Sequence, residues 1–244
     1  MNTLVISYQY PLPEIGGNRI RTMNLVRYFK QFGDVDIVYF QECAAIDKSG
    51  VVFRNETLVD ISRTTKSKSR FHDLYDRIRY VKPWIVCSFS RETVHDLVNI
   101  IEQSDYDHIV CRYVVSAYPL FFVSAKTREK VIVDIDDLMT PDLYEAVYGL
   151  LRGIRSIKSF IDMKLFRQFQ INCAQIGKAL VCSAHDKELL SNEAPLADVY
   201  IVPNIAPDMT LSATYIRDGF DRLTTLLFVG NLGYQPTLAG LSGL

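Results

Sequence analysis

The chain has 244 residues, of which 48% are hydrophobic and 23% charged, and its formal net charge is −1. Such a chain is long enough to bury a sizeable core, and its near-neutral charge gives no argument for a nucleic-acid partner. No apolar run approaches the roughly 20 residues that a membrane-spanning helix needs, and no secretory signal is visible, so we expect a cytoplasmic protein.

Strand-like apolar runs alternate with helical patterns along the whole chain. Runs of β-branched and aromatic residues predict strands at residues 3–8, 35–40, 51–61, 108–111, 131–135, 178–182 and 199–202. The spacing of apolar residues predicts helices over residues 19–32, 71–81, 92–103, 141–169 and 185–192. This alternation predicts an α/β fold, a Rossmann-like parallel sheet with helices on both faces.

The end of the chain repeats the pattern of its beginning. Residues 224–229 form an apolar strand pattern that runs into a loop with Gly230 and Gly233, which is typical of the start of a second α/β domain. We therefore predict a first domain at residues 1–205, a linker at 206–223, and the first strand and loop of an otherwise missing domain at 224–244.

The first predicted strand is followed by a loop with Gly16 and Gly17, and Arg19 and Arg21 lie in the first turn of the next predicted helix. Backbone N–H groups at a helix N-terminus, joined by guanidinium groups, suit a diphosphate. A plain turn is an equally good interpretation of the glycines alone. The dinucleotide fingerprint GxGxxG is absent, which weakens the interpretation as a nucleotide-binding oxidoreductase.

Three carboxylates, Asp134, Asp136 and Asp137, stand at the end of the predicted strand 131–135. Buried carboxylates are costly unless they are solvated, paired or bound to a metal. We expect Asp136 and Asp137 to act in catalysis or to contact a substrate hydroxyl, with a helix cap as an equal alternative. A DxD site for Mg²⁺ or Mn²⁺ at Asp134 and Asp136 is a weaker alternative, and the five cysteines show no zinc spacing.

Other polar residues follow strand ends. Arg112 and Tyr113 follow the predicted strand 108–111 and are candidates for binding an acceptor in the same cleft. Ser183 is expected to cap the helix 185–192, with His185 in its first turn.

Two basic segments have the pattern of amphipathic helices that pack on their own domain or lie on anionic lipid. Their basic residues are Arg63, Lys66, Lys68, Arg70, Arg77, Arg79 and Lys82 in the first segment, and Arg152, Arg155, Lys164 and Arg167 in the second. We expect peripheral contact with the inner face of the membrane as one possibility beside simple packing.

Several of these patterns together resemble one enzyme family. They occur in the family's order and spacing at residues 11–24, 131–137, 182–186, 202–204 and 227–232. This set resembles the retaining glycosyltransferases of family four, which have the GT-B fold. Ile205 departs from the family, in which glycine commonly follows the Pro-Asn turn. Asp136 and Asp137 stand where many members place a histidine.

The resemblance implies transfer of a sugar from a nucleotide-diphosphate donor to an acceptor hydroxyl, with retention of configuration and no other cofactor. It implies that the first domain binds a sugar or lipid-linked acceptor, and that Gly16, Gly17 and Arg19 face the donor diphosphate. In the family, the second domain supplies most contacts to the nucleotide sugar. A chain with only the beginning of that domain is therefore expected to be catalytically weak or inactive alone. Two alternatives remain: a non-catalytic acceptor-binding module, and a metal-dependent DxD glycosyltransferase.

Overall fold

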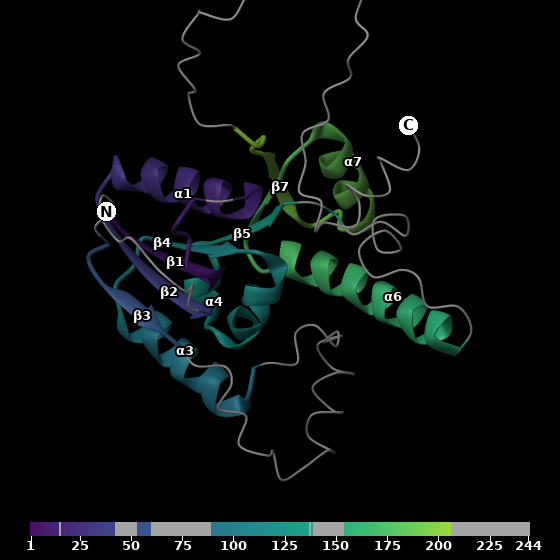
Figure 1. Ribbon diagram of the computed structural model, residues 1–244, viewed down its shortest axis with the longest axis horizontal. Helices are drawn as coiled ribbons and strands as arrows, with labels where there is room; N and C mark the ends of the chain where they lie inside the picture. Colours follow the sequence, from purple (N-terminus) through teal and green to yellow (C-terminus); the bar gives the residue numbers. More distant parts are fainter. Residues whose placement is uncertain (15, 42–52, 60–88, 137, 139–153, 206–244) are drawn as a thin grey trace, which may run out of the picture.

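The computed structural model describes residues 1–14, 16–41, 53–59, 89–136, 138 and 154–205. These residues form one parallel sheet with the strand order β3-β2-β1-β4-β5-β6-β7 (Figure 1). Every neighbouring pair in the sheet is parallel. The strands are β1 (Asn2–Gln9), β2 (Asp34–Gln41), β3 (Glu56–Leu58), β4 (His108–Arg112), β5 (Val131–Asp136), β6 (Lys178–Val181) and β7 (Asp198–Ile201). The predicted Rossmann-like α/β fold is confirmed.

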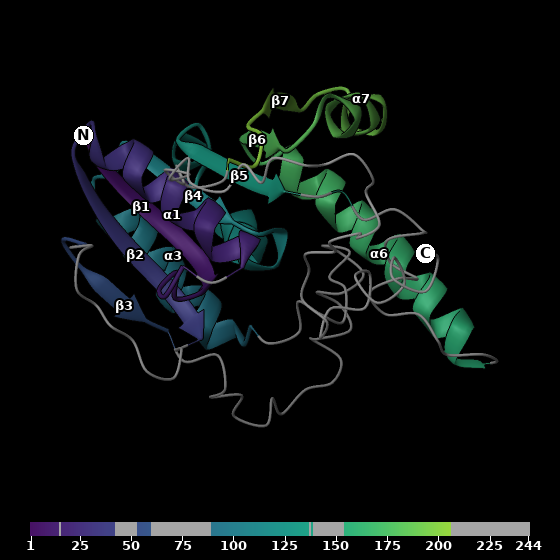
Figure 2. The ribbon, with the colours of Figure 1, turned by 45° about the horizontal axis from the view of Figure 1, so that its top comes forward.

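Helices cover both faces of the sheet. They are α1 (Gly17–Lys30), α3 (Arg91–Gln103), the 3₁₀ helix η2 (Val114–Phe122), α4 (Ala125–Arg128), α6 (Ile154–Ala174) and α7 (Ala184–Glu193). Helix α1 packs on one face, where Met23, Val26 and Phe29 bury against Val5 and Val110. Figure 2 shows α1 lying along β1 on this face. Side chains of α3, η2, α6 and α7 share a second core with the opposite face of the sheet.

The strand order changes direction between β1 and β4. From β1 the chain passes through α1 to β2 on one side, and it later returns through α3 to β4 on the other side of β1. In open parallel sheets, ligands bind at such a switch point, outside the carboxyl ends of the strands. The fold therefore directs attention to the ends of β1 and β4.

Local sequence explains several element boundaries. Ser90 and Ser183 cap α3 and α7, because their hydroxyls accept hydrogen bonds from the N–H groups of Thr93 and Asp186. The cap expected at Ser183 is thus confirmed. At Gly33, a Cβ atom would lie 2.0 Å from the carbonyl oxygen of Met1, so glycine allows the N-terminus to pass close to the turn before β2.

The structure extends some predicted elements. Helix α6 continues to Ala174, beyond the predicted end at residue 169, because Phe166, Phe169, Gln170 and Cys173 keep one buried face. Helix η2 was not predicted, since Pro119 within it disfavours an α-helix.

Other predictions fall on residues outside the described part of the chain. These are the helix 71–81, the first basic segment, the start of the helix 141–169, the linker 206–223 and the strand and loop at 224–244.

Candidate functional site

The candidate site lies at the carboxyl edge of the sheet, around the switch point. The loop with Gly16 and Gly17 follows β1, Tyr113 follows β4, and Asp136 ends β5. Cys182 follows β6, and Val202 follows β7. Because parallel strands all end at the same edge, the topology brings these residues together although they are far apart in the sequence. Asp137 lies outside the described residues.

The glycine loop leaves the N-terminus of α1 open. Gly16 is the N-cap, with φ 87° and ψ 149°, and no side chain of the described residues caps the helix. Both glycines are exposed, and a Cβ atom on either would have no described heavy atom within 4 Å. The first N–H groups of a helix lack intrahelical partners, and this end of the helix favours anions. Gly16 and Gly17 therefore form a sterically accessible place for an anion.

Arg19 lies beside this loop. It is half-buried, and its Nη1 lies 3.4 Å from the carbonyl oxygen of Pro13. Arg27, two turns further along α1, forms an ion pair with Glu14 of the same loop. Arg19 therefore lies next to the glycines, whereas the charge of Arg27 is paired with Glu14.

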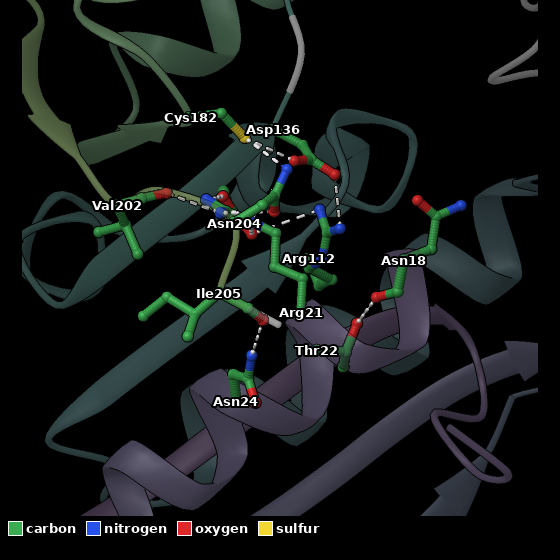
Figure 3. Close-up of polar contacts among 11 residues, drawn as sticks. Asn18, Arg21, Thr22, Asn24, Arg112, Asp136, Cys182, Val202, Asn204 and Ile205 are labelled. Atoms are coloured by element: carbon green, nitrogen blue, oxygen red, sulfur yellow. Dashed lines mark hydrogen bonds and ion pairs between the residues drawn. The ribbon is translucent and has the colours of Figure 1, made fainter. Parts of the chain in front are cut away.

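At the ends of β4 and β5, two arginines and two aspartates form a buried cluster, of which Figure 3 labels Arg21, Arg112 and Asp136. Arg21 of α1 binds Asp134 with two parallel hydrogen bonds, from Nε at 2.8 Å and from Nη2 at 2.7 Å. Arg112 donates from Nη2 to Asp136 at 2.6 Å, and its Nη1 lies 3.3 Å from Asp134. The two positive guanidinium groups balance the two negative carboxylates. Burial of ionised groups is tolerated when each charge is paired in this way.

The cluster extends to β6 and to the chain after β7. The thiol of Cys182 donates to Oδ1 of Asp136 at 2.8 Å, and Asn204 Nδ2 lies 3.3 Å from the same sulfur. Arg21 also donates from Nη1 to the carbonyl oxygen of Val202 at 2.6 Å and to Oδ1 of Asn204 at 3.1 Å. One network therefore joins α1 with the ends of four strands.

The charges shift the pKa values of the cluster. Burial of the Asp136 carboxyl favours its neutral form, but the charge of Arg112 and hydrogen bonds from Cys182 and Arg112 outweigh it and lower the pKa. Burial likewise disfavours the charged guanidinium groups, but the aspartates raise the pKa of Arg21 and Arg112. All three groups are therefore held in their charged forms, and Asp136 is poorly suited to donate a proton near neutral pH.

The lowered pKa of Asp136 predicts a pH-dependent stability. In the unfolded chain this carboxyl titrates at about pH 4. The stabilisation that ionised Asp136 gives to the folded chain is therefore complete above that pH, and it is lost as the pH falls through the lower pKa of the folded state. We expect Asp136→Asn to be less stable than the parent chain at pH 7, with the difference shrinking below pH 4. Urea denaturation at several pH values measures this, and a difference that stays constant with pH would contradict it.

Backbone strain is concentrated at the same edge. Tyr113 and Asp136 have φ values of 70° and 64°, and they are the non-glycine residues with positive φ in the described part of the chain. The pairing of β5 with β6 also shifts register between Asp134 and Asp136. Strained residues and β-bulges cost free energy and cluster near functional sites. The positive φ values of Tyr113 and Asp136 and the register shift in β5 therefore support a function at the carboxyl edge of the sheet.

The structure places some candidates differently from the sequence-based expectation. Arg21 does not point to the glycine loop, because the buried carboxylate of Asp134 attracts its guanidinium. Arg112 is 0% exposed, and its guanidinium stacks on the Tyr113 ring with 3.9 Å between Cζ and the ring centroid. Arg112 thus lies in the interior, whereas Tyr113 is partly exposed. A role of Tyr113 in acceptor binding stays a prediction.

The aspartates fit a divalent cation poorly. Both oxygens of Asp134 bind Arg21, and both oxygens of Asp136 accept from Arg112 or Cys182. A cation at Asp134 and Asp136 would have to displace buried guanidinium groups. Among the described residues, no group of three or more His, Cys, Asp or Glu side chains could hold a metal ion.

A separate cavity of about 190 Å³ lies at the opposite, amino-terminal edge, where Glu102, Lys126 and Lys130 are among its lining residues. Glu102 accepts hydrogen bonds from Ser124 and Thr127, and Lys130 donates to the carbonyl oxygen of Tyr106. Glu102 and Lys130 thus have partners within the protein, and the cavity lies at the other edge of the sheet from the glycine loop, so it adds nothing to the site at the carboxyl edge.

Sequence reasoning missed the partners within the cluster. Burial of three carboxylates was recognised as costly, but the cations that neutralise two of them come from α1 and β4, far away in the sequence. Arg21 carried one usable signal. It lies four residues before Leu25 and eight before Phe29, both apolar, so helical spacing places it on the face of the helix that packs on the sheet.

No helix in the described ranges is both long and apolar enough to cross a membrane. Neither a scan against protein-family models nor a search of curated proteins returned a match for this chain.

Proposed function

We propose that the chain is the acceptor-side domain of a retaining glycosyltransferase with a nucleotide-diphosphate sugar as its donor. In this proposal, Gly16, Gly17 and Arg19 face the donor diphosphate, and Tyr113 lies on the acceptor side. The remaining donor contacts belong to a second domain, of which residues 224–244 are the proposed beginning. The chain alone is accordingly expected to bind a diphosphate weakly and to transfer little or no sugar.

One observation carries the proposal most strongly. The open N-terminus of α1 lies beside the switch point of a Rossmann-like sheet, and its two exposed glycines have free space around them. No described atom beside either glycine blocks the approach of a diphosphate to the backbone N–H groups from the side of the missing Cβ. Arg19 adds a positive charge next to the loop, which suits the charge that develops on a departing nucleoside diphosphate.

Nuclear magnetic resonance (NMR) tests the proposal, because it detects weak binding residue by residue. Inorganic pyrophosphate, UDP and GDP are titrated into the ¹⁵N-labelled chain, with sodium chloride at equal ionic strength as control. We expect saturable shifts at the amides of Gly16, Gly17 and Asn18. Shifts that do not saturate, or that sodium chloride reproduces, would refute a diphosphate site at this loop.

A non-catalytic acceptor-binding module is the second candidate. It is favoured by the buried pairing of Asp136 with Arg112 and Cys182, which leaves this carboxylate without an obvious catalytic task. Restoring a second domain separates the two candidates. Sugar transfer by the extended protein supports the enzyme, whereas acceptor binding without transfer supports the module.

Peripheral membrane contact is also part of the proposal. In α6, which extends beyond the sheet (Figures 1 and 2), Phe160 and Ile161 are 58% and 51% exposed. Lys164 lies above the Phe160 ring, with 5.6 Å between Nζ and the ring centroid. Exposed apolar residues beside a basic one suit an anionic lipid surface. Co-sedimentation with phosphatidylglycerol vesicles, but not with phosphatidylcholine vesicles, is expected, and its absence would exclude the contact.

A further inference from the structure

Residues 202–205, which we call the exit segment, leave the sheet after β7 and contact α1. Asn24 Nδ2 donates to the carbonyl oxygen of Ile205 at 3.0 Å, and Arg21 Nη1 donates to that of Val202 at 2.6 Å (Figure 3). The exit segment is therefore bound by side chains of a helix that lies about 180 positions earlier in the sequence.

Arg21 joins the exit segment to the sheet as well. Its Nε and Nη2 bind Asp134 at the end of β5, while Nη1 binds Val202 and Asn204. A guanidinium group is planar, and its donors have fixed directions. The bonds to Asp134 therefore fix where Val202 and Asn204 must lie to bind the same guanidinium group. Since Arg21 is 4% exposed and paired with a fully buried aspartate, water competes little for these bonds.

We infer that Arg21 and Asn24 are positioning residues that couple the exit segment to the glycine loop through α1. The helix is continuous from Gly17 to Lys30, and Asn24 follows Gly17 by about 10 Å along its axis. A shift of the first turn on anion binding would therefore move the residues that hold the exit segment. The inference rests on the proposed function, in which this segment leads to the donor-binding domain.

Coupling of this kind is reciprocal. If holding the exit segment favours the helix position that binds an anion, then releasing the segment weakens anion binding, although Asn24 does not belong to the glycine loop. A purely structural role for Asn24 predicts lower stability instead, without a selective effect on binding. These two consequences can be measured separately.

The first measurement needs no ligand. ¹⁵N order parameters of Asn204 and Ile205 are compared in the parent chain, Asn24→Ala, Arg21→Lys and the control Asn99→Ala. Asn99 also lies in a helix and has its side-chain contact within that helix, to His95. We expect values near about 0.85 in the parent chain and the control, and below about 0.6 in the two α1 variants. Unchanged order parameters in both α1 variants would overturn the inference.

The second measurement is the pyrophosphate titration of the same proteins. We expect Asn24→Ala to raise the Kd for pyrophosphate about fivefold while the Tm stays unchanged. Asn24→Gln is expected to restore the parent Kd, and Asn99→Ala is expected to leave the Kd unchanged. If pyrophosphate binds and Asn24→Ala leaves the Kd at the parent value, the coupling is overturned and the proposed function stands. If pyrophosphate does not bind the parent chain, the proposed function and the coupling both fail, and the order parameters alone decide whether α1 holds the segment.

Discussion

Replacing Gly17 with alanine is expected to weaken pyrophosphate binding at least tenfold while the Tm stays within about 2 °C of the parent value. Gly17 does not have a positive φ, and an added Cβ would meet no described atom. The folded chain therefore tolerates alanine at this position. A bound diphosphate, by contrast, would meet the new methyl group and lose close contact with the backbone N–H groups, and charged hydrogen bonds contribute about 1.5–3 kcal/mol each.

Gly16→Ala is the comparison for stability, because alanine at this position should destabilise the chain in addition to crowding the proposed diphosphate. Gly16 has φ 87° and ψ 149°, a region that is nearly restricted to glycine and costs other residues about 1–3 kcal/mol. Thermal unfolding followed by circular dichroism, together with the NMR titration, distinguishes the two variants. If Gly17→Ala binds pyrophosphate like the parent chain, the glycine loop is a plain turn.

Asp134→Asn is expected to lower the free energy of unfolding by about 3–5 kcal/mol, because it leaves two buried guanidinium groups with a single carboxylate. Asp134 is fully buried and accepts two hydrogen bonds from Arg21, while Arg112 lies 3.3 Å away. The amide of asparagine keeps the shape of the side chain but removes its charge. Urea denaturation at pH 7 measures the loss.

Asp105→Asn provides the comparison for the same chemical change. Asp105 pairs with Lys130 at 3.6 Å, but its side chain is fully exposed to solvent. An exposed ion pair contributes little, so no measurable loss is expected. Equal effects of the two substitutions would show that the buried cluster is not an important source of stability.

The sequence was sufficient for the fold class, because strand and helix patterns are local. Nearly continuous apolar runs such as residues 3–8 and 131–135 are typical of strands that are buried on both faces, as in a parallel sheet covered by helices. The Ser183 cap was likewise readable, since a serine before a helix bonds an N–H group three residues later. Helix η2 was missed because Pro119 within it disfavours an α-helix.

The candidate site was only partly predictable. The glycine loop and Arg19 are neighbours in the sequence, so their proximity followed from local order. Arg112 was predicted to bind an acceptor in the cleft, and the structure shows it fully buried, because the residue pattern at a strand end does not distinguish an exposed end from a buried one. Asp136 was recognised as a carboxylate in need of a partner, but the partner's identity depended on which strands lie side by side.

By itself, then, the sequence determined a Rossmann-like parallel sheet and placed a pair of glycines directly before the first helix. Only the tertiary structure decided that Arg21 and Arg112 neutralise Asp134 and Asp136, and that Asn24 and Arg21 hold residues 202–205. The physical reason is that periodicity and capping depend on residues a few positions apart. Charge pairing in the interior depends on strand order and on which helix face meets the sheet, and these bring together residues more than 100 positions apart.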